Sequence, residues 1–284
     1  MPQPRFSIAS YSFHSLFSNG AMTLVQYLET VRYRYGLQTA DIWSPMIASF
    51  EDGYLNMVRA QMDERGLSLV NLCCDLAHVW TDDENEERLC SQTARDVLKA
   101  ARILGAQTIR IDMGIGPKQA TDEQIEHCAK KYDEYCKVAD GFGAKLGTEN
   151  HWGASTDIAV IRKLFQAVKA KNFAVLLHLG NWQCDTQDEK DACDIEIAPK
   201  AMHMHLHYDA CVNADKQLPP LAAAGYAGAW AVECGKGTNE YNNVSFQLAQ
   251  ARRVVSPLDY QMNRSGGANE GGKILMRKVM QSRS

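Results

Sequence analysis

The feature of this 284-residue sequence that most limits its fold is a regular alternation between two kinds of segment. Short apolar runs rich in β-branched residues are each followed by a longer segment whose apolar residues recur every three or four positions. The first pattern predicts buried strands and the second predicts amphipathic helices, a pairing typical of parallel βα units. Strands are predicted at residues 6–12, 38–43, 67–74, 106–112, 144–149, 173–178, 200–206 and 229–233.

Eight such units favour a closed (β/α)8 TIM barrel, which is an α/β fold, over an open doubly wound sheet. No GxGxxG follows the first predicted strand, which counts further against a Rossmann domain. The clearest helix is predicted over residues 84–104 and ends at Gly105, whereas the polar stretch 181–197 is predicted to be a loop with only a short helix.

The barrel is expected to be a single domain that occupies residues 1–256. Residues 257–284 include the glycine-rich run RSGGANEGG and are expected to form a C-terminal extension. A surface tail, a lid over the site and a dimer arm are three interpretations of this extension that the sequence leaves open.

The composition excludes several classes of function. A net charge of −4 offers no general attraction for phosphate backbones, so we expect no nucleic-acid partner. No apolar run approaches the roughly 18 to 20 residues of a membrane span, and no membrane partner is expected. The nine cysteines are scattered and form no CxxC pair, which favours reduced, mostly buried thiols and a cytoplasmic location.

Polar residues gather at the carboxyl ends of the last four predicted strands. In a TIM barrel the active site lies at this end, because the βα loops converge there. The fifth strand ends in Glu149 and is followed by His151, the sixth ends in His178, and the eighth ends in Glu233. The seventh strand contains three histidines at alternate positions, and alternate side chains of a strand share one face: His203, His205 and His207.

This set of residues predicts a metal site. A single strand histidine is more often a hydrogen-bonded core residue than a ligand. Three of them on one face are harder to satisfy in a core, because each has two ring nitrogens. Carboxylates and imidazoles from neighbouring strands make a mixed nitrogen and oxygen site, which suits Mn²⁺, Co²⁺, Fe²⁺ or Zn²⁺ better than Ca²⁺.

Other polar and aromatic residues near the strand ends are expected to shape a substrate pocket. Each of them has an alternative structural role, such as a buried ion pair or aromatic packing. The candidates for substrate binding are His14, Trp43, Asp75, Arg110, Asp112, Trp152, Asn181, Trp182, His203 and His207.

Four motifs resemble the xylose-isomerase-like barrels, the sugar phosphate isomerase/epimerase superfamily. They are TENHWG, LLHLGNW, MHMHLHYD and GYAGAWAVE, and the resemblance covers roughly residues 5 to 256. It implies one divalent metal ion (Mn²⁺, Co²⁺, Zn²⁺ or Mg²⁺), held by Glu149, His178, His205 and Glu233. At two positions the sequence departs from the usual family pattern: His178 stands where aspartate is common, and His207 stands in place of a lysine.

The resemblance also implies the chemistry. The metal acts as a Lewis acid on a carbonyl or hydroxyl oxygen and stabilises the enediolate that forms when the neighbouring proton leaves. The expected catalytic residues are Glu149, His151 and Glu233, with His151 or Glu233 as the base. The chain is therefore expected to be a metal-dependent sugar isomerase or epimerase.

Several alternatives stay open. The histidine two residues after the strand-five glutamate also resembles the catalytic subunits of C-glycoside deglycosidases, so a lyase, hydratase or deglycosidase acting on 3-keto-sugars or 3-keto-glycosides is the second hypothesis. A non-catalytic sugar-binding barrel is the third, and a three-zinc AP endonuclease is disfavoured by the charge. The expected partner is a small-molecule sugar or glycoside, together with a homo-oligomer or a partner subunit.

Overall fold

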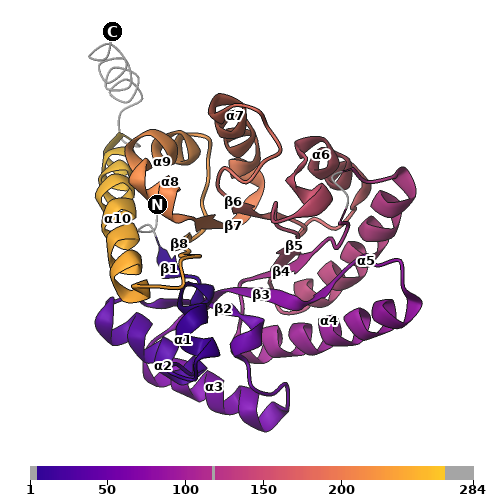
Figure 1. Ribbon diagram of the computed structural model, residues 1–284, viewed down its shortest axis with the longest axis horizontal. Coiled ribbons are helices and arrows are strands. Elements are labelled where there is room, and N and C mark those ends of the chain that lie inside the picture. The colour runs from indigo at the N-terminus through magenta and orange to yellow at the C-terminus, as the bar shows by residue number, and fades with distance from the viewer. Residues whose placement is uncertain (1–4, 117–118, 266–284) are drawn as a thin grey trace.

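The computed structural model describes residues 5–116 and 119–265, and in this part of the chain the predicted barrel is present, with eight parallel strands surrounded by helices (Figure 1). The strands are β1 (Phe6–Ile8), β2 (Thr39–Trp43), β3 (Ser68–His78), β4 (Thr108–Asp112), β5 (Lys145–Gly147), β6 (Val175–His178), β7 (Ala201–Leu206) and β8 (Trp230–Val232). The helices are α1 (His14–Ser18), α2 (Leu24–Glu29), α3 (Asp52–Glu64), α4 (Glu84–Leu104), α5 (Asp122–Asp140), α6 (Ile158–Ala167), α7 (Gln187–Ile197), α8 (Tyr208–Val212), α9 (Ala214–Ala223) and α10 (Glu240–Ser265). Short helical turns lie at η1 (Ser10–Phe13), η2 (Thr30–Arg34), η3 (Ser44–Met46), η4 (Gly153–Thr156) and η5 (Ala198–Lys200).

Helix α4 has the bounds that the periodicity predicts, and local chemistry sets both ends. The Asp83 carboxylate accepts hydrogen bonds from the backbone N–H groups of Asn85 and Glu86. The helix ends at Gly105, which has a left-handed φ of 73°. The stretch 181–197, predicted to be a loop with only a short helix, is more helical than predicted, because α7 occupies eleven of its residues. A capping box between Thr186 and Glu189 stabilises the start of α7 despite its weak apolar pattern.

The barrel consists of two half-barrels that meet at two seams. One has the strand order β1-β8-β7-β6 and the other has the order β2-β3-β4-β5. Isolated bridges close the ring, from Ala9 to Asp41 at one seam and from Glu149 to Leu176 at the other. Hence residues from both half-barrels face a common interior.

Each seam has a specific residue that lets the two backbones meet. At the first seam, the Tyr27 hydroxyl donates to the Ile8 carbonyl (2.6 Å) and accepts from the Asp41 N–H (3.0 Å), so a side chain replaces a ladder hydrogen bond. At the second seam, a Cβ atom on Gly147 would lie 1.7 Å from the Ala174 carbonyl oxygen. Only glycine permits this close approach of β5 and β6.

Three strands end earlier than predicted. The strand predicted over 6–12 ends at Ile8, the one over 144–149 at Gly147 and the one over 229–233 at Val232. Beyond the end of β1, serine hydroxyl groups accept hydrogen bonds from backbone N–H groups of the neighbouring segments. Ser12 Oγ accepts from the Cys234 N–H at 2.9 Å, and Ser10 Oγ accepts from the Trp43 N–H at 2.8 Å.

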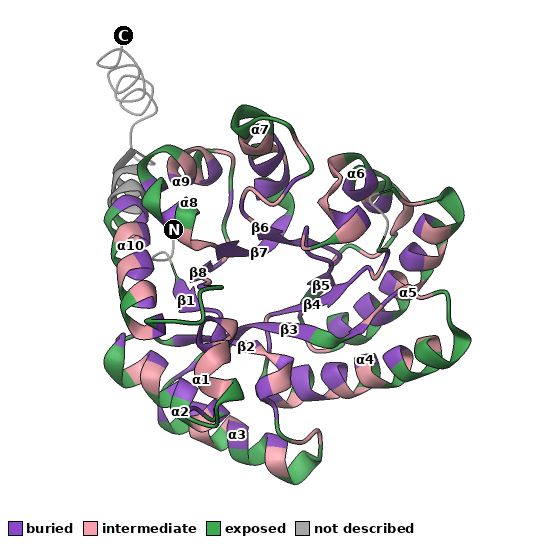
Figure 2. Ribbon diagram, viewed as in Figure 1, coloured by how far each residue is buried: buried purple, intermediate pink, exposed green. Residues whose placement is uncertain are grey.

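Buried residues line the strands and the inner faces of the helices, while exposed residues lie on the outside (Figure 2). All nine cysteines are free thiols, and eight of them are buried. Within the described residues, no helix has the length and apolarity needed to cross a membrane.

The predicted extension at 257–284 overlaps the last helix. Helix α10 runs from Glu240 to Ser265 and therefore continues past the predicted domain boundary at 256. Residues 266–284 lie outside the described residues, so the tail, lid and dimer-arm interpretations stay predictions.

Candidate metal centre

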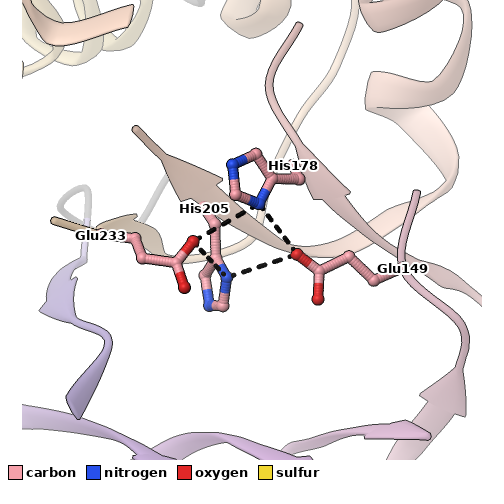
Figure 3. Close-up of side chains that lie close together, drawn as sticks. All are labelled: Glu149, His178, His205 and Glu233. Atoms are coloured by element: carbon pink, nitrogen blue, oxygen red, sulfur yellow. Dashed lines mark hydrogen bonds and ion pairs between the residues drawn. The ribbon is translucent and has the colours of Figure 1, made fainter. Parts of the chain in front are cut away.

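Four side chains from neighbouring strands converge at the mouth of the barrel (Figure 3). Glu149 follows β5, His178 ends β6, His205 lies on β7 and Glu233 follows β8. His178 Nδ1 lies 3.0 Å from Glu149 Oε1 and 3.4 Å from Glu233 Oε2, and His205 Nδ1 lies 3.6 Å and 3.3 Å from the same two oxygens. The four residues are those that the family resemblance implies as metal ligands.

The donor set fits a divalent cation. Ligands that surround one ion at about 2.1 Å in a tetrahedron lie about 3.4 Å from one another, close to the separations observed between these four atoms. His205 Nδ1 and Glu233 Oε2 are buried and have no hydrogen-bond partner among the described residues. Buried polar atoms without partners are costly, and a cation between them would satisfy both.

Asp41 on β2 orients His205 from across the barrel. Its Oδ2 accepts from His205 Nε2 at 3.0 Å and from His203 Nε2 at 2.7 Å, and all three residues are almost fully buried. The hydrogen bond to Nε2 leaves His205 Nδ1 to face the cluster. A carboxylate behind a histidine ligand is the usual arrangement for fixing the ring and its tautomer.

Arg110 on β4 orients Glu149, as Asp41 orients His205. Its Nε lies 2.9 Å from Glu149 Oε2, and its Nη1 lies 3.2 Å from Asp112 and also contacts Asp75. Glu149 therefore points Oε1 at the cluster while Oε2 is held by a buried guanidinium. This contact removes Glu149 Oε2 from any role as a free base.

The charges at the site are strongly coupled. Burial would raise the pKa of Glu149, but Arg110 and the two histidines hold it well below its ordinary value. Burial would lower the pKa of His205, but the carboxylates of Glu233 and Asp41 raise it well above its ordinary value. A proton on His205 thus supplies part of the positive charge that a metal cation would supply.

His151 forms a pair with Asp112 beside the cluster. His151 Nδ1 lies 2.8 Å from Asp112 Oδ2, which leaves Nε2 as the ring nitrogen available to a ligand. Burial alone would lower the pKa of His151, but the hydrogen bond with Asp112 and the charge of Glu149 raise it to about 9. The pair therefore favours a protonated imidazole at neutral pH.

The loops that follow β5 and β6 are tied together by side-chain amides. The Asn150 side chain donates to the His178 carbonyl at 2.8 Å and accepts from the His178 N–H at 2.7 Å. The Asn181 amide donates to the carbonyls of Asn150 and His151 at 2.6 and 2.7 Å. Asp194 on α7 accepts from the Trp182 indole at 2.7 Å, and burial raises the pKa of Asp194 to about 7.

A cavity of about 250 Å³ lies over the cluster. The lining includes three members of the cluster, namely His178, His205 and Glu233, and also His151. Four of the predicted substrate-binding residues also line it: Trp43, Asp75, Arg110 and His207.

The other predicted substrate-binding residues do not line this cavity. Asp112 and His203 lie behind His151 and His205, and Asn181 is occupied with backbone carbonyls. Trp182 is 4% exposed and bonded to Asp194, so its ring is not available for stacking on a ligand. The remaining two lie at the rim, His14 stacked on Tyr11 and Trp152 edge-on to His78.

Two residues have roles at the site that differ from the sequence interpretation. Tyr11 lines the cavity beside Trp43, although it falls inside the strand predicted over 6–12. Its position just after the end of β1 is the signal that would have found it. Asp41 on β2 lines the cavity and holds two histidines through one carboxylate oxygen.

A family model described as the xylose isomerase-like TIM barrel matches residues 33–245 of this chain. A search of curated proteins finds no match.

Solved structures with similar folds share little sequence with this chain. The IolI protein with a bound zinc atom has a TM-score of 0.68 and 12% identity, and the match covers 89% of this chain and 98% of that one. The probable 3-DHS dehydratase AsbF from Bacillus anthracis has a TM-score of 0.66 and 10% identity, with 87% and 98% covered. A D-psicose 3-epimerase studied in the presence of D-fructose has a TM-score of 0.65 and 15% identity, with 89% and 99% covered.

Proposed function

The chain belongs to the xylose isomerase-like TIM barrel family, and from this premise we propose that it is a divalent-metal-dependent sugar isomerase or epimerase. The observation that carries the proposal is the cluster of Glu149, His178, His205 and Glu233, whose facing atoms lie 3.0 to 3.6 Å apart. Two imidazoles and two carboxylates suit Mn²⁺, Co²⁺ or Zn²⁺ more than Mg²⁺.

A bound cation would polarise a substrate carbonyl and stabilise the charge that appears on its oxygen when the neighbouring proton is removed. The two glutamates are not equivalent in this role. Arg110 forms an ion pair with the second oxygen of Glu149, whereas the ion pairs of Glu233 among the described residues all use Oε2 and leave Oε1 free of a charged partner. Glu233 is therefore the residue that we assign as the base.

His151 is the natural partner for Glu233 in an epimerisation. It comes from the loop after β5 in one half-barrel, while Glu233 follows β8 in the other. Asp112 keeps the His151 ring oriented and protonated, so His151 can return a proton to the substrate after Glu233 has taken one. Inversion of a carbon centre requires one group that removes the proton from one face and a second group that returns it to the opposite face, and we assign these roles to Glu233 and His151.

The cavity lining favours a polyhydroxylated substrate. Asp75 and Arg110 offer charged hydrogen-bonding groups, while Tyr11 and Trp43 form an aromatic wall against which a sugar ring can pack. The D-psicose epimerase and the dehydratase with similar folds act on small polar molecules, according to their names, which supports this class.

A second cavity favours one alternative, a lyase or dehydratase that acts on 3-keto-sugars or 3-keto-glycosides. It measures about 310 Å³, and His207 lines both this cavity and the first. Its wall is polar, with Lys190, Asn213, Lys216 and Gln217 among the lining residues. A substrate with a polar substituent could extend past His207 into this space, and loss of that substituent would be an elimination.

The proposal is tested first by metal content. Elemental mass spectrometry should find about one equivalent of metal at this cluster in the wild type. The site should be lost in Glu149→Gln, His178→Ala, His205→Ala and Glu233→Gln, and kept in His151→Ala, which changes no ligand. Retention of this metal in all four ligand variants would contradict the assignment.

The reaction is tested by proton exchange in ²H₂O with keto-sugars and 3-keto-glycosides. An isomerase or epimerase should incorporate deuterium beside the carbonyl and conserve the mass of the product otherwise, whereas a lyase should release a fragment or water. Both Glu233→Gln and His151→Ala should reduce the rate by at least about 100-fold. Metal binding without any exchange would favour a non-catalytic sugar-binding barrel.

A further inference from the structure

A second group of ligand-type side chains lies at the rim of the barrel and shares no residue with the first. It consists of His78 at the end of β3 and of Glu86 and Cys90 on α4. One ligand atom from each lies within 4.8 Å of the other two. We infer that His78, Glu86 and Cys90 form a separate site for a thiolate-accepting divalent cation such as Zn²⁺.

The placement of the three residues follows from the local fold. Glu86 and Cys90 are four residues apart on α4 and therefore share one face of the helix. That face is turned toward the end of β3, where His78 Nε2 lies 3.5 Å from Glu86 Oε1. Two ligands of one zinc ion lie about 3.3 to 3.6 Å apart, so this pair already has the spacing of a shared cation.

Neighbouring residues hold the side chains of Glu86 and His78 in place. Glu86 Oε2 accepts a hydrogen bond from Thr81 Oγ1 at 2.6 Å, which fixes the carboxylate and leaves Oε1 directed at His78. The His78 side chain packs against the backbone at Gly114, where any added Cβ would collide with it. Both ligands are thus held by neighbours that do not belong to the cluster.

The Cys90 thiol is the unexplained member of this group. Its residue is 6% exposed, and its sulfur has no hydrogen-bond partner among the described residues. Other buried thiols do find one, since Cys136 Sγ lies 3.6 Å from the Leu146 carbonyl and Cys74 Sγ lies 3.8 Å from the Ala77 carbonyl. A cation beside His78 and Glu86 would give Cys90 the partner that it lacks.

The chemistry of the donors separates this site from the one at the barrel mouth. A thiolate, an imidazole and a carboxylate favour Zn²⁺ or Co²⁺, and a thiolate has little affinity for Mg²⁺. His78 is paired with Asp112 in the β3–β4 register, and Asp112 in turn orients His151. A cation at the rim would therefore tie the segment between β3 and α4 to the strand that positions His151.

The test uses Co²⁺ as the probe, because a cobalt–thiolate bond gives a charge-transfer absorption that oxygen and nitrogen ligands do not. Wild type loaded with Co²⁺ should bind about two equivalents and show this absorption. Cys90→Ser and Glu86→Gln should each bind one equivalent fewer and lose the band. Glu84→Gln, which changes an exposed glutamate in the same turn of α4, should behave as wild type.

The two sites are distinguished by a third variant. His205→Ala should lose the equivalent at the barrel mouth and keep the thiolate band. Wild type without the band, or a band that persists in Cys90→Ser, would overturn the rim site whatever happens at the mouth. Near-ultraviolet circular dichroism of each variant confirms that a lost equivalent reflects a lost ligand in a folded protein.

Discussion

The two half-barrels contribute to the same site in different ways. One half-barrel supplies three members of the cluster, from the ends of β6, β7 and β8: His178, His205 and Glu233. The Nδ1 atoms of the two histidines lie 3.4 and 3.3 Å from Glu233 Oε2. Strands β2 and β4 of the other supply Asp41 and Arg110, which face the backs of the cluster residues.

The cluster is therefore held in place by side chains from the opposite side of the barrel. Asp41 fixes His205, and Arg110 fixes Glu149, which lies at the seam where β5 meets β6. One half-barrel thus presents most of the atoms available to a metal, and the other decides which atom each residue presents. Changing the second group should weaken the site without removing any member of the cluster.

The largest effect is expected from Arg110→Met. This substitution removes the buried guanidinium that lies between three carboxylates, those of Glu149, Asp75 and Asp112. Removing one partner of a buried ion pair costs about 3–5 kcal/mol, so the free energy of unfolding of the metal-free protein should fall by about that amount. Chemical denaturation with urea measures the change.

The matched control is Arg162→Met on the surface of α6. Arg162 pairs with Glu196, but both side chains are substantially exposed. An exposed pair contributes less than about 1 kcal/mol, so this variant should be nearly as stable as wild type. Equal losses in the two variants would show that Arg110 has no special role in joining the half-barrels.

A smaller effect is expected from Asp41→Asn, which keeps the shape of the side chain and removes its charge. Asn71, which donates to Asp41 Oδ1 at 2.9 Å, can turn its amide over to suit the new group. Loss of a carboxylate behind a histidine ligand typically weakens metal binding by about 10- to 100-fold. Competition with a chromophoric chelator measures the dissociation constant of the metal. An unchanged value would contradict the proposal that one half-barrel orients the metal-binding residues of the other.

The last effect depends on pH and concerns the half-barrel that carries three members of the cluster. Asp194 is buried there beside Trp182, and burial raises its pKa to about 7 from an ordinary 3.8. Between these two values the folded protein retains a proton that the unfolded chain releases, so this group makes stability fall as the pH rises from 3.8 to about 7. Asp194→Asn lacks this contribution.

The measurement is the difference in free energy of unfolding between Asp194→Asn and wild type at several pH values. That difference should shift in favour of the variant from pH 3.8 up to about pH 7 and stay constant above. A difference that does not vary with pH would mean that Asp194 is ionised in the folded protein, as Asp41 is beside its two histidines.

Much of the architecture could be predicted from local pattern. The eight strands and the bounds of α4 follow from apolar periodicity and from capping residues close in sequence. Helix α7 was underestimated because its capping box, rather than an apolar stripe, stabilises its start. The early ends of β1 and β8 differ from the prediction because serine hydroxyl groups replace the ladder there. After β5 the pairing continues only as the isolated bridge from Glu149 to Leu176.

For the site, the residue types and strand ends predicted a group of carboxylates and histidines at one end of the barrel. The family resemblance then implied which four of them the structure brings together. The same reasoning placed Trp182 and His203 in the substrate pocket, whereas the structure buries both and bonds them to carboxylates. Strand alternation predicts the face on which a side chain lies, but not its depth in the barrel. Depth depends on the stagger of strands from both half-barrels.

By itself, therefore, the sequence determined the barrel, the end at which the site lies and the residue types gathered there, because these depend on periods of two and 3.6 residues and on strand termini. Only the tertiary structure decided which nitrogen of His205 faces the cluster and which oxygen of Glu149 is free. Those choices depend on Asp41 and Arg110, which lie 164 and 39 positions away along the chain and come into contact only when the barrel closes.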